Sequence, residues 1–128
     1  MQVISFIRLQ VKGTDMDLVK GTLDILILKA ASWTPAHGYD IARWIGQSSG
    51  GVLQVDEGAL YQALRRLELR GLLRSEWGIT HTGREAKFYE LTAEGRRQFA
   101  ARARSWGDYT EAMARVLSSR RAPGEVSA

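Results

Sequence analysis

The chain has 128 residues, 45% of them hydrophobic and none of them cysteine, so it can form one small domain with an appended element but no disulfide framework. Its net charge of +4 favours a polyanionic partner, either nucleic acid or an anionic membrane surface. Because it lacks both a secretory signal and an apolar run of the roughly 20 residues that span a bilayer, we expect a soluble, cytoplasmic protein with no membrane partner.

The N-terminal segment, residues 1–16, is the hardest to interpret. Apolar and polar residues alternate between Val3 and Val11 as in a strand, but no partner strand follows nearby. Met16 is an alternative start of the natural chain. We interpret residues 1–16 as an N-terminal extension that is disordered or packs loosely.

Two helices are expected next. From Asp17 to Ala30 the sequence is apolar almost all round, which is typical of a helix that is buried on more than one side. Pro35 prevents this helix from continuing, and a shorter helix is predicted from Gly38 to Gly46. After a glycine-rich turn, residues 52–55 are interpreted as a short strand that completes a three-stranded sheet with a later hairpin.

A third helix is predicted between Asp56, whose carboxylate can accept from the free amides of the first turn, and Gly71, which ends it. Its inner face is apolar, with Leu60, Ala63, Leu64 and Leu67 at helical spacing. Its outer face is polar and cationic and carries Gly58, Gln62 and Arg65, flanked by Tyr61 and Arg66. Such a helix can bury one side and approach a phosphate backbone with the other.

Two β-prone runs follow the third helix. Residues 72–77 and 87–91 are joined by the glycine-bounded, partly basic stretch 78–86. Together with the preceding pair of helices, this hairpin has the order of a winged helix-turn-helix. We therefore predict an α+β, mainly α fold in which residues 17–91 form a winged helix-turn-helix DNA-binding domain.

The last predicted element is a long helix over residues 92–119, with Thr92 as its N-cap. A stripe of mostly apolar side chains runs along it: Phe99, Ala103, Trp106, Thr110, Met113 and Leu117. No other element of the chain remains to cover this heptad stripe, so a second copy is the expected cover, with Leu18 of the first helix as a further interface residue. Residues 120–128 are predicted to be a disordered tail.

Five blocks of residues identify a family resemblance. They are His37 to Tyr39, Gly50 to Tyr61, Leu67 to Leu72, Glu76 to Gly78, and Ala86 to Tyr89 with Leu91 to Gly95. In this order they resemble the PadR family of bacterial transcriptional regulators, most of all its short-chain branch, and residues 18–24 are similar to the form common in acidobacterial members. The resemblance covers residues 17–117.

The resemblance implies an N-terminal winged helix-turn-helix and a C-terminal helix that dimerises. It also implies binding to a double-stranded DNA operator, usually as a repressor that a small molecule relieves. Two positions depart from the family pattern. Gln62 replaces the usual proline after the tyrosine of the third helix, and the wing tip has only Arg84 before Glu85.

The candidate DNA contacts lie on the third helix, on the wing and at the start of the second helix. Arg65 suits guanine and Gln62 suits adenine by bidentate hydrogen bonding. The expected phosphate contacts are Tyr61, Arg66, Arg84 and Lys87, and Gly58 lets the helix approach the backbone closely. Tyr39 is either another phosphate contact or a packing residue. The alternative for the whole face is an ordinary solvated helix surface.

Trp106 is the candidate ligand-binding residue. It is followed by Gly107, which leaves space beside the indole. In multidrug-sensing members of the short branch, a tryptophan at the matching place stacks on flat hydrophobic molecules between two subunits. In this chain Asp108 and Glu111 would favour a cationic effector if they reach such a site. The alternative is that Trp106 only fills the dimer interface. Trp33, Trp44 and Trp77 are interpreted as core or wing-base packing.

No catalytic or metal-binding pattern is found in the sequence. The two histidines, His37 and His81, lack ligand-type neighbours at metal spacing, and Asp56 with Glu57 is better explained by helix capping than by acid–base catalysis. We therefore expect a homodimeric regulator that is not an enzyme and uses no cofactor. The alternatives are a dimeric small-molecule-binding protein and a protein-interaction winged helix, each without specific DNA recognition.

Overall fold

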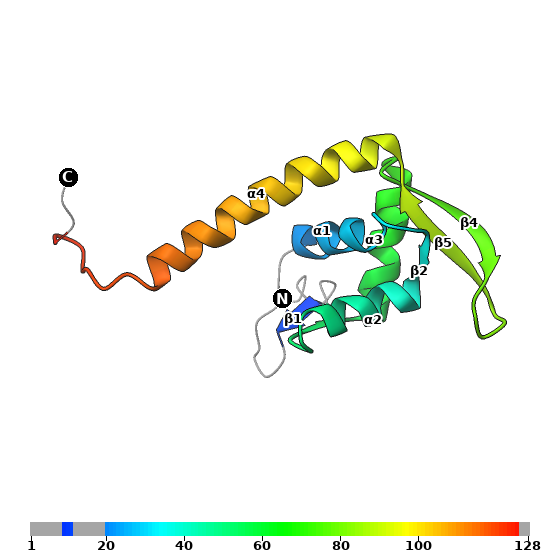
Figure 1. Ribbon diagram of the computed structural model, residues 1–128, viewed down its shortest axis with the longest axis horizontal. Coiled ribbons are helices and arrows are strands. Elements are labelled where there is room, and N and C mark those ends of the chain that lie inside the picture. The colour runs from blue at the N-terminus through cyan, green and yellow to red at the C-terminus, as the bar shows by residue number, and fades with distance from the viewer. Residues whose placement is uncertain (1–8, 12–19, 126–128) are drawn as a thin grey trace.

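The computed structural model describes residues 9–11 and 20–125, which form four helices and five short strands (Figure 1). In chain order these are β1 (Leu9–Val11), α1 (Lys20–Ala30), β2 (Ala36–His37), α2 (Gly38–Ser48), β3 (Leu53–Val55), α3 (Glu57–Leu69), β4 (Leu73–Ile79), β5 (Glu85–Leu91) and α4 (Ala93–Leu117). In these ranges no helix combines the length and apolarity that crossing a membrane requires. The mainly helical fold with a small antiparallel sheet is the one predicted.

The core lies where α1, α2 and α3 meet. Its fully buried side chains come from all three helices and from β4: Ile27, Leu28, Ile41, Leu60, Leu64, Leu67 and Leu73. α1 is buried along most of its described length, as its nearly continuous apolar sequence predicted. The four apolar positions predicted for the inner face of α3 are all buried, so the helical spacing identified that face correctly.

Local chemistry explains the two ends of α3. The Asp56 carboxylate accepts a hydrogen bond from the Ala59 amide at 3.0 Å, which satisfies one of the free donors of the first turn. At the other end Gly71 has a φ of +78°, a backbone conformation that residues with a Cβ rarely adopt. Both predicted signals are confirmed.

The wing is an antiparallel hairpin of β4 and β5, paired from Leu73 with Leu91 to Ile79 with Glu85. The strands are longer and the tip shorter than predicted, because regular pairing continues to Ile79 and the turn spans only residues 80–84. Thr80 closes this turn: its amide donates to the Arg84 carbonyl at 2.8 Å.

The third strand of the wing sheet is β2, not the predicted strand at residues 52–55. Ala36 pairs with Tyr89 and His37 pairs with Phe88, whereas β3 forms a separate two-stranded sheet with β1. A strand of two residues has no alternation of polar and apolar side chains to detect.

β1 corrects the interpretation of the N-terminal extension. Leu9 pairs with Val55 and Val11 with Leu53 in antiparallel register, so these three residues form a regular strand. Their partner strand lies more than 40 residues along the chain, too far for a local sequence pattern to reveal. Residues 1–8 and 12–19, which include the predicted interface residue Leu18, lie outside the described residues.

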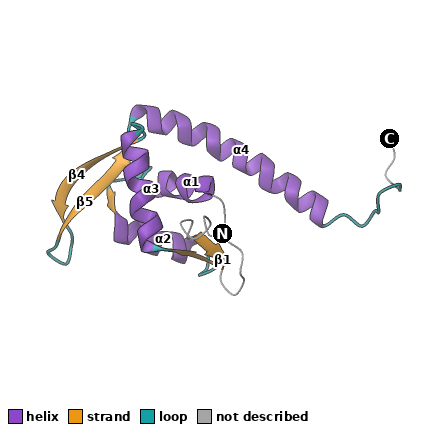
Figure 2. Ribbon diagram, turned by 180° about the vertical axis from the view of Figure 1, so that it is seen from behind, coloured by secondary structure: helices purple, strands orange, loops and turns teal. Residues whose placement is uncertain are grey.

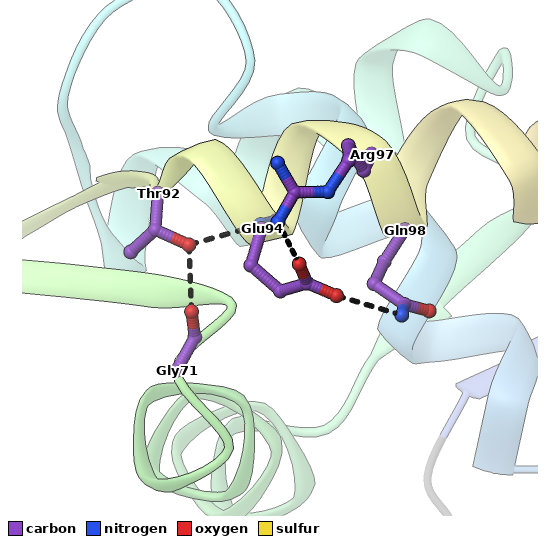
Figure 3. Close-up of polar contacts among 6 residues, drawn as sticks. Gly71, Thr92, Glu94, Arg97 and Gln98 are labelled. Carbon is purple, nitrogen blue, oxygen red and sulfur yellow. Dashed lines mark hydrogen bonds and ion pairs between the residues drawn. The ribbon is translucent and has the colours of Figure 1, made fainter.

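α4 is joined to the end of α3 by hydrogen bonds around Thr92 (Figure 3). The Thr92 hydroxyl accepts from the Gly95 amide at 2.9 Å and donates to the Gly71 carbonyl at 2.6 Å. The Thr92 amide donates to the Leu72 carbonyl at 3.1 Å. Thr92 is therefore the predicted N-cap and, in addition, a link between α4 and the turn that ends α3.

The first turn of α4 is also stabilised by its own side chains. The Glu94 carboxylate accepts from Gln98 at 3.0 Å and from Arg97, as Figure 3 shows. The hydrogen bond from Gln98, and then that from Arg97, hold the pKa of Glu94 below its ordinary value. After its first turns α4 projects away from the domain (Figures 1 and 2).

We predict that Gly95→Ala destabilises the fold, because a Cβ at this position would lie 2.0 Å from the backbone oxygen of Leu72. The backbone must shift to accommodate it, so the free energy of unfolding should fall by about 1–3 kcal/mol. Urea denaturation measures this change. Gly46→Ala is the matched control, since its Cβ would meet only Leu53 O at an ordinary 3.8 Å; equal stability of the two variants would contradict the prediction.

Candidate nucleic-acid interface

The outer face of α3 is open to solvent. Gly58, Tyr61, Gln62 and Arg65 are all exposed, because burial of the opposite leucine face determines which way they point. The ring of Tyr61 is held at Gly38, where an added Cβ would lie only 2.8 Å from the tyrosine ring. The sequence therefore placed these four residues on the correct face.

Arg66 does not belong to this face. Its guanidinium forms an ion pair of 2.5 Å with Asp24 of α1, whose side chain is only 6% exposed. The Arg66 side chain is 25% exposed, and its Nε is buried without a hydrogen-bond partner among the described residues. The structure therefore places Arg66 in an ion pair with Asp24 and not among the exposed side chains of α3, and its predicted phosphate contact stays a prediction. The acid in the apolar run of α1 was the signal, since a buried carboxylate needs a cationic partner.

A groove of about 840 Å³ separates the helices from the wing. Tyr39 and Tyr61 line it from the helices, and Arg84, Lys87 and Trp77 line it from the wing. Four of the predicted DNA contacts therefore come together in one groove. Gln62 and Arg65 do not line it and lie farther along the exposed face of α3.

The groove carries charges of both signs. Its cations are Arg43, Arg84 and Lys87, and its acids are Asp40, Glu57 and Glu85. The Asp40 carboxylate lies 3.2 Å from His37 Nε2 and 3.9 Å from the Arg43 guanidinium. The positive charge of Arg43 compensates part of the negative charge of Asp40. The sequence had not indicated Arg43 or Asp40 as part of the interface, because only the fold brings α2 beside the wing.

Tyr89 forms part of the floor of the groove. Burial, with a further contribution from the Glu68 carboxylate, raises the pKa of the Tyr89 hydroxyl above its ordinary value. At neutral pH this hydroxyl is therefore protonated and can donate a hydrogen bond.

The tryptophans differ from one another in exposure. Trp44 is half-buried against the core, as predicted, and Trp33 makes an edge contact with it at 5.5 Å although it remains exposed. Trp77 is 67% exposed. The prediction that Trp77 packs at the base of the wing is therefore wrong.

The stripe on α4 is covered at one end only. Phe99 packs against the core of its own domain, so the prediction that no element covers the stripe is wrong at this residue, because α1 lies beneath the first turns of α4. Ala103 and Trp106 are half-exposed, whereas Thr110, Met113 and Leu117 are exposed. Tyr109 and Val116, not predicted, extend the exposed apolar surface.

Among residues 9–11 and 20–125, no group of three or more His, Cys, Asp or Glu side chains is suited to a metal ion. His37 is buried, with its ring edge-to-face against Phe88 at 5.2 Å. His81 is exposed in the wing turn.

Comparison with known proteins gives consistent matches. The Transcriptional regulator PadR-like family matches residues 27–101. A PadR family transcriptional regulator from Eggerthella lenta is 30% identical over 79% of this chain and 86% of its own, with a TM-score of 0.63. A PadR family transcription regulator from Clostridium difficile is 29% identical over 77% of this chain and 100% of its own, with a TM-score of 0.66. A PadR-like transcriptional regulator from Bacillus cereus is 25% identical over 79% of this chain and 96% of its own, with a TM-score of 0.68.

We predict that Asp24→Asn destabilises the protein, because it leaves the Arg66 charge partly buried without its partner. The loss should be smaller than the roughly 3–5 kcal/mol of a fully buried pair, since a quarter of the Arg66 side chain is exposed. Urea denaturation measures the change. The double variant Asp24→Leu with Arg66→Met should regain much of the stability; no loss in the single variant would show that the ion pair is unimportant.

Proposed function

Because the chain belongs to the PadR-like family of transcriptional regulators, we propose that it binds a double-stranded DNA operator as a homodimer and represses transcription until a small molecule binds. The observation that carries the DNA-binding role is the exposed polar face of α3 beside a groove shared with the wing. Helix and wing can then contact neighbouring parts of one duplex.

In this proposal α3 enters the major groove. Gln62 and Arg65 contact base edges, because they are exposed on α3 away from the groove walls. Tyr39, Tyr61, Arg84 and Lys87 contact the phosphate backbone and set the orientation of the domain. Gly58, near the start of the helix, allows a close approach.

The homodimer rests on the exposed part of α4. Trp106, Tyr109, Met113, Val116 and Leu117 present apolar surface that no described part of the chain covers. A second α4 would bury this surface and remove it from water. A dimer places two α3 helices in successive major grooves about 34 Å apart.

The effector site is proposed beside Trp106. Its indole lies edge-to-face against the Tyr109 ring, 5.6 Å between centroids, which offers aromatic surface to a flat hydrophobic molecule. Asp108 and Glu111 follow on the same helix, although Glu111 also pairs with Arg115 at 3.2 Å. Such a molecule lowers operator affinity only if it binds the two arrangements of the DNA-binding domains with different affinity.

The test of the function is fluorescence-anisotropy binding to DNA from the protein's own promoter and to a scrambled duplex of equal length. At near-physiological salt we expect a preference of about tenfold or more for the promoter. Equal affinity for both duplexes would rule out recognition of a specific sequence in this promoter. No binding to either would favour a small-molecule-binding or protein-interaction role.

Arg65 and Arg84 are predicted to contribute differently. Arg65→Ala should cost about 1–3 kcal/mol and relax specificity at one base position. Arg84→Ala should weaken promoter and scrambled duplexes alike and reduce the slope of log affinity against log salt by about 1. Arg104→Ala, an exposed cation on α4, controls for the change in net charge. If Arg65→Ala weakens binding to promoter and scrambled duplexes equally, Arg65 contacts phosphate and not a base.

Trp106→Ala is predicted to weaken binding of a flat aromatic cation more than binding of promoter DNA, because it removes the stacking surface. Ligand binding is measured without DNA by fluorescence anisotropy, and sedimentation equilibrium is run on both proteins. The wild type should be a dimer. Dissociation of the Trp106→Ala dimer would instead show that Trp106 fills the interface.

A further inference from the structure

The face of the wing that packs on α3 continues beyond its contact with that helix. Along this face the paired residues are Leu73 with Leu91, Ser75 with Tyr89, Trp77 with Lys87, and Ile79 with Glu85, because alternate residues of a strand share a side. The first pair is buried, and Ser75 donates to Glu68 of α3 at 2.6 Å. Past this contact Trp77 and Ile79 are 67% and 63% exposed.

The hairpin is braced from its other face. The Phe88 ring lies so close to Gly78 that an added Cβ there would be 2.9 Å from the ring. Phe88 also packs edge-to-face on His37, and β2 is paired with β5 at this point. Trp77 is therefore held at a defined position on a supported strand, although its indole is exposed.

A cation lies beside the exposed indole, and an acid, Glu85, is the cross-strand partner of Ile79. Lys87 is the cross-strand partner of Trp77, with its Nζ 5.9 Å from the ring centroid. Arg84 lies in the turn beyond, and both cations line the groove that Tyr61 lines from α3. Small apolar surface beside cations matches the DNA backbone, in which apolar deoxyribose carbons alternate with phosphates. A second copy of the chain would match the broader apolar surface of α4 instead.

We propose that Trp77, together with Ile79, packs on deoxyribose of the operator backbone and that the indole N–H donates to a neighbouring phosphate. This rests on the proposed DNA-binding function and adds an apolar contact of the wing to it. The contact positions the wing without recognising base sequence. This contact contributes to DNA affinity by removing the apolar surface of the indole and the sugar from water, whereas Arg84 and Lys87 contribute through their charge.

The first test is Trp77→Ala in the anisotropy assay. Affinity for promoter and scrambled duplexes should fall by a similar factor, about tenfold, with an unchanged salt slope, because no phosphate charge was neutralised. Lys87→Ala should instead reduce the slope by about 1. Trp33→Ala, which removes another exposed tryptophan, should leave affinity unchanged, and Trp77→Phe should retain most of it. A loss confined to the promoter, a changed salt slope or a changed oligomeric state would overturn the proposal.

The second test uses a variant in which Trp77 is the only tryptophan, because the other three of the four are replaced. In the variant Trp33→Phe, Trp44→Phe, Trp106→Phe, saturating duplex should protect Trp77 fluorescence from quenching by acrylamide. Unchanged quenching would overturn the contact even if the Trp77→Ala variant folds poorly. The proposed function fails separately, if the wild-type protein does not prefer the promoter; protection by both duplexes would still support a backbone contact.

Discussion

Burial of the inner face of α3 is the constraint on which the rest of the structure depends. Leu60, Leu64 and Leu67 are almost completely removed from water between α1, α2 and the base of the wing. Because a helix has a fixed rotation per residue, burying these side chains also determines which residues point outward. The Asp24–Arg66 ion pair links α1 to α3 from the side and opposes rotation of α3 about its axis.

The same helix is connected directly to α4. The carbonyl of Gly71, in the turn that ends α3, accepts from the Thr92 hydroxyl, and the next carbonyl, of Leu72, accepts from the Thr92 amide. Gly95 allows the first turn of α4 to approach this backbone closely. A displacement of α4 would therefore act on the turn between α3 and β4 through these two hydrogen bonds. Coupling between a dimer interface and a DNA-binding surface needs contiguous contacts of this kind.

The candidate DNA surface combines different kinds of interaction. The groove contains acids as well as cations, so charge alone gives the helix side of the groove little attraction for phosphate. The exposed aromatic side chains Tyr39, Tyr61 and Trp77 lie in the same groove. Shape and apolar contact on such a surface complement the electrostatic attraction of Arg84 and Lys87, and they respond less to salt.

The sequence by itself determined the features that depend on neighbouring residues. Asp56 and Thr92 cap helices through their own first turns, and the spacing of Leu60, Leu64 and Leu67 showed the inner face of α3. The family and the order of helices and hairpin followed from motifs within short stretches. These signals depend only on residues close together in the sequence, so they can be recognised without knowledge of the fold.

Only the tertiary structure decided which distant residues meet. The strand partner of β3 is β1, the third wing strand is β2, and Arg66 pairs with Asp24. The local sequence does not distinguish Trp77 from a packing tryptophan, yet its side chain is exposed because the wing continues beyond the contact between Ser75 and Glu68 of α3. Partner choice and exposure depend on the relative positions of whole elements, and no local pattern of residues contains that information.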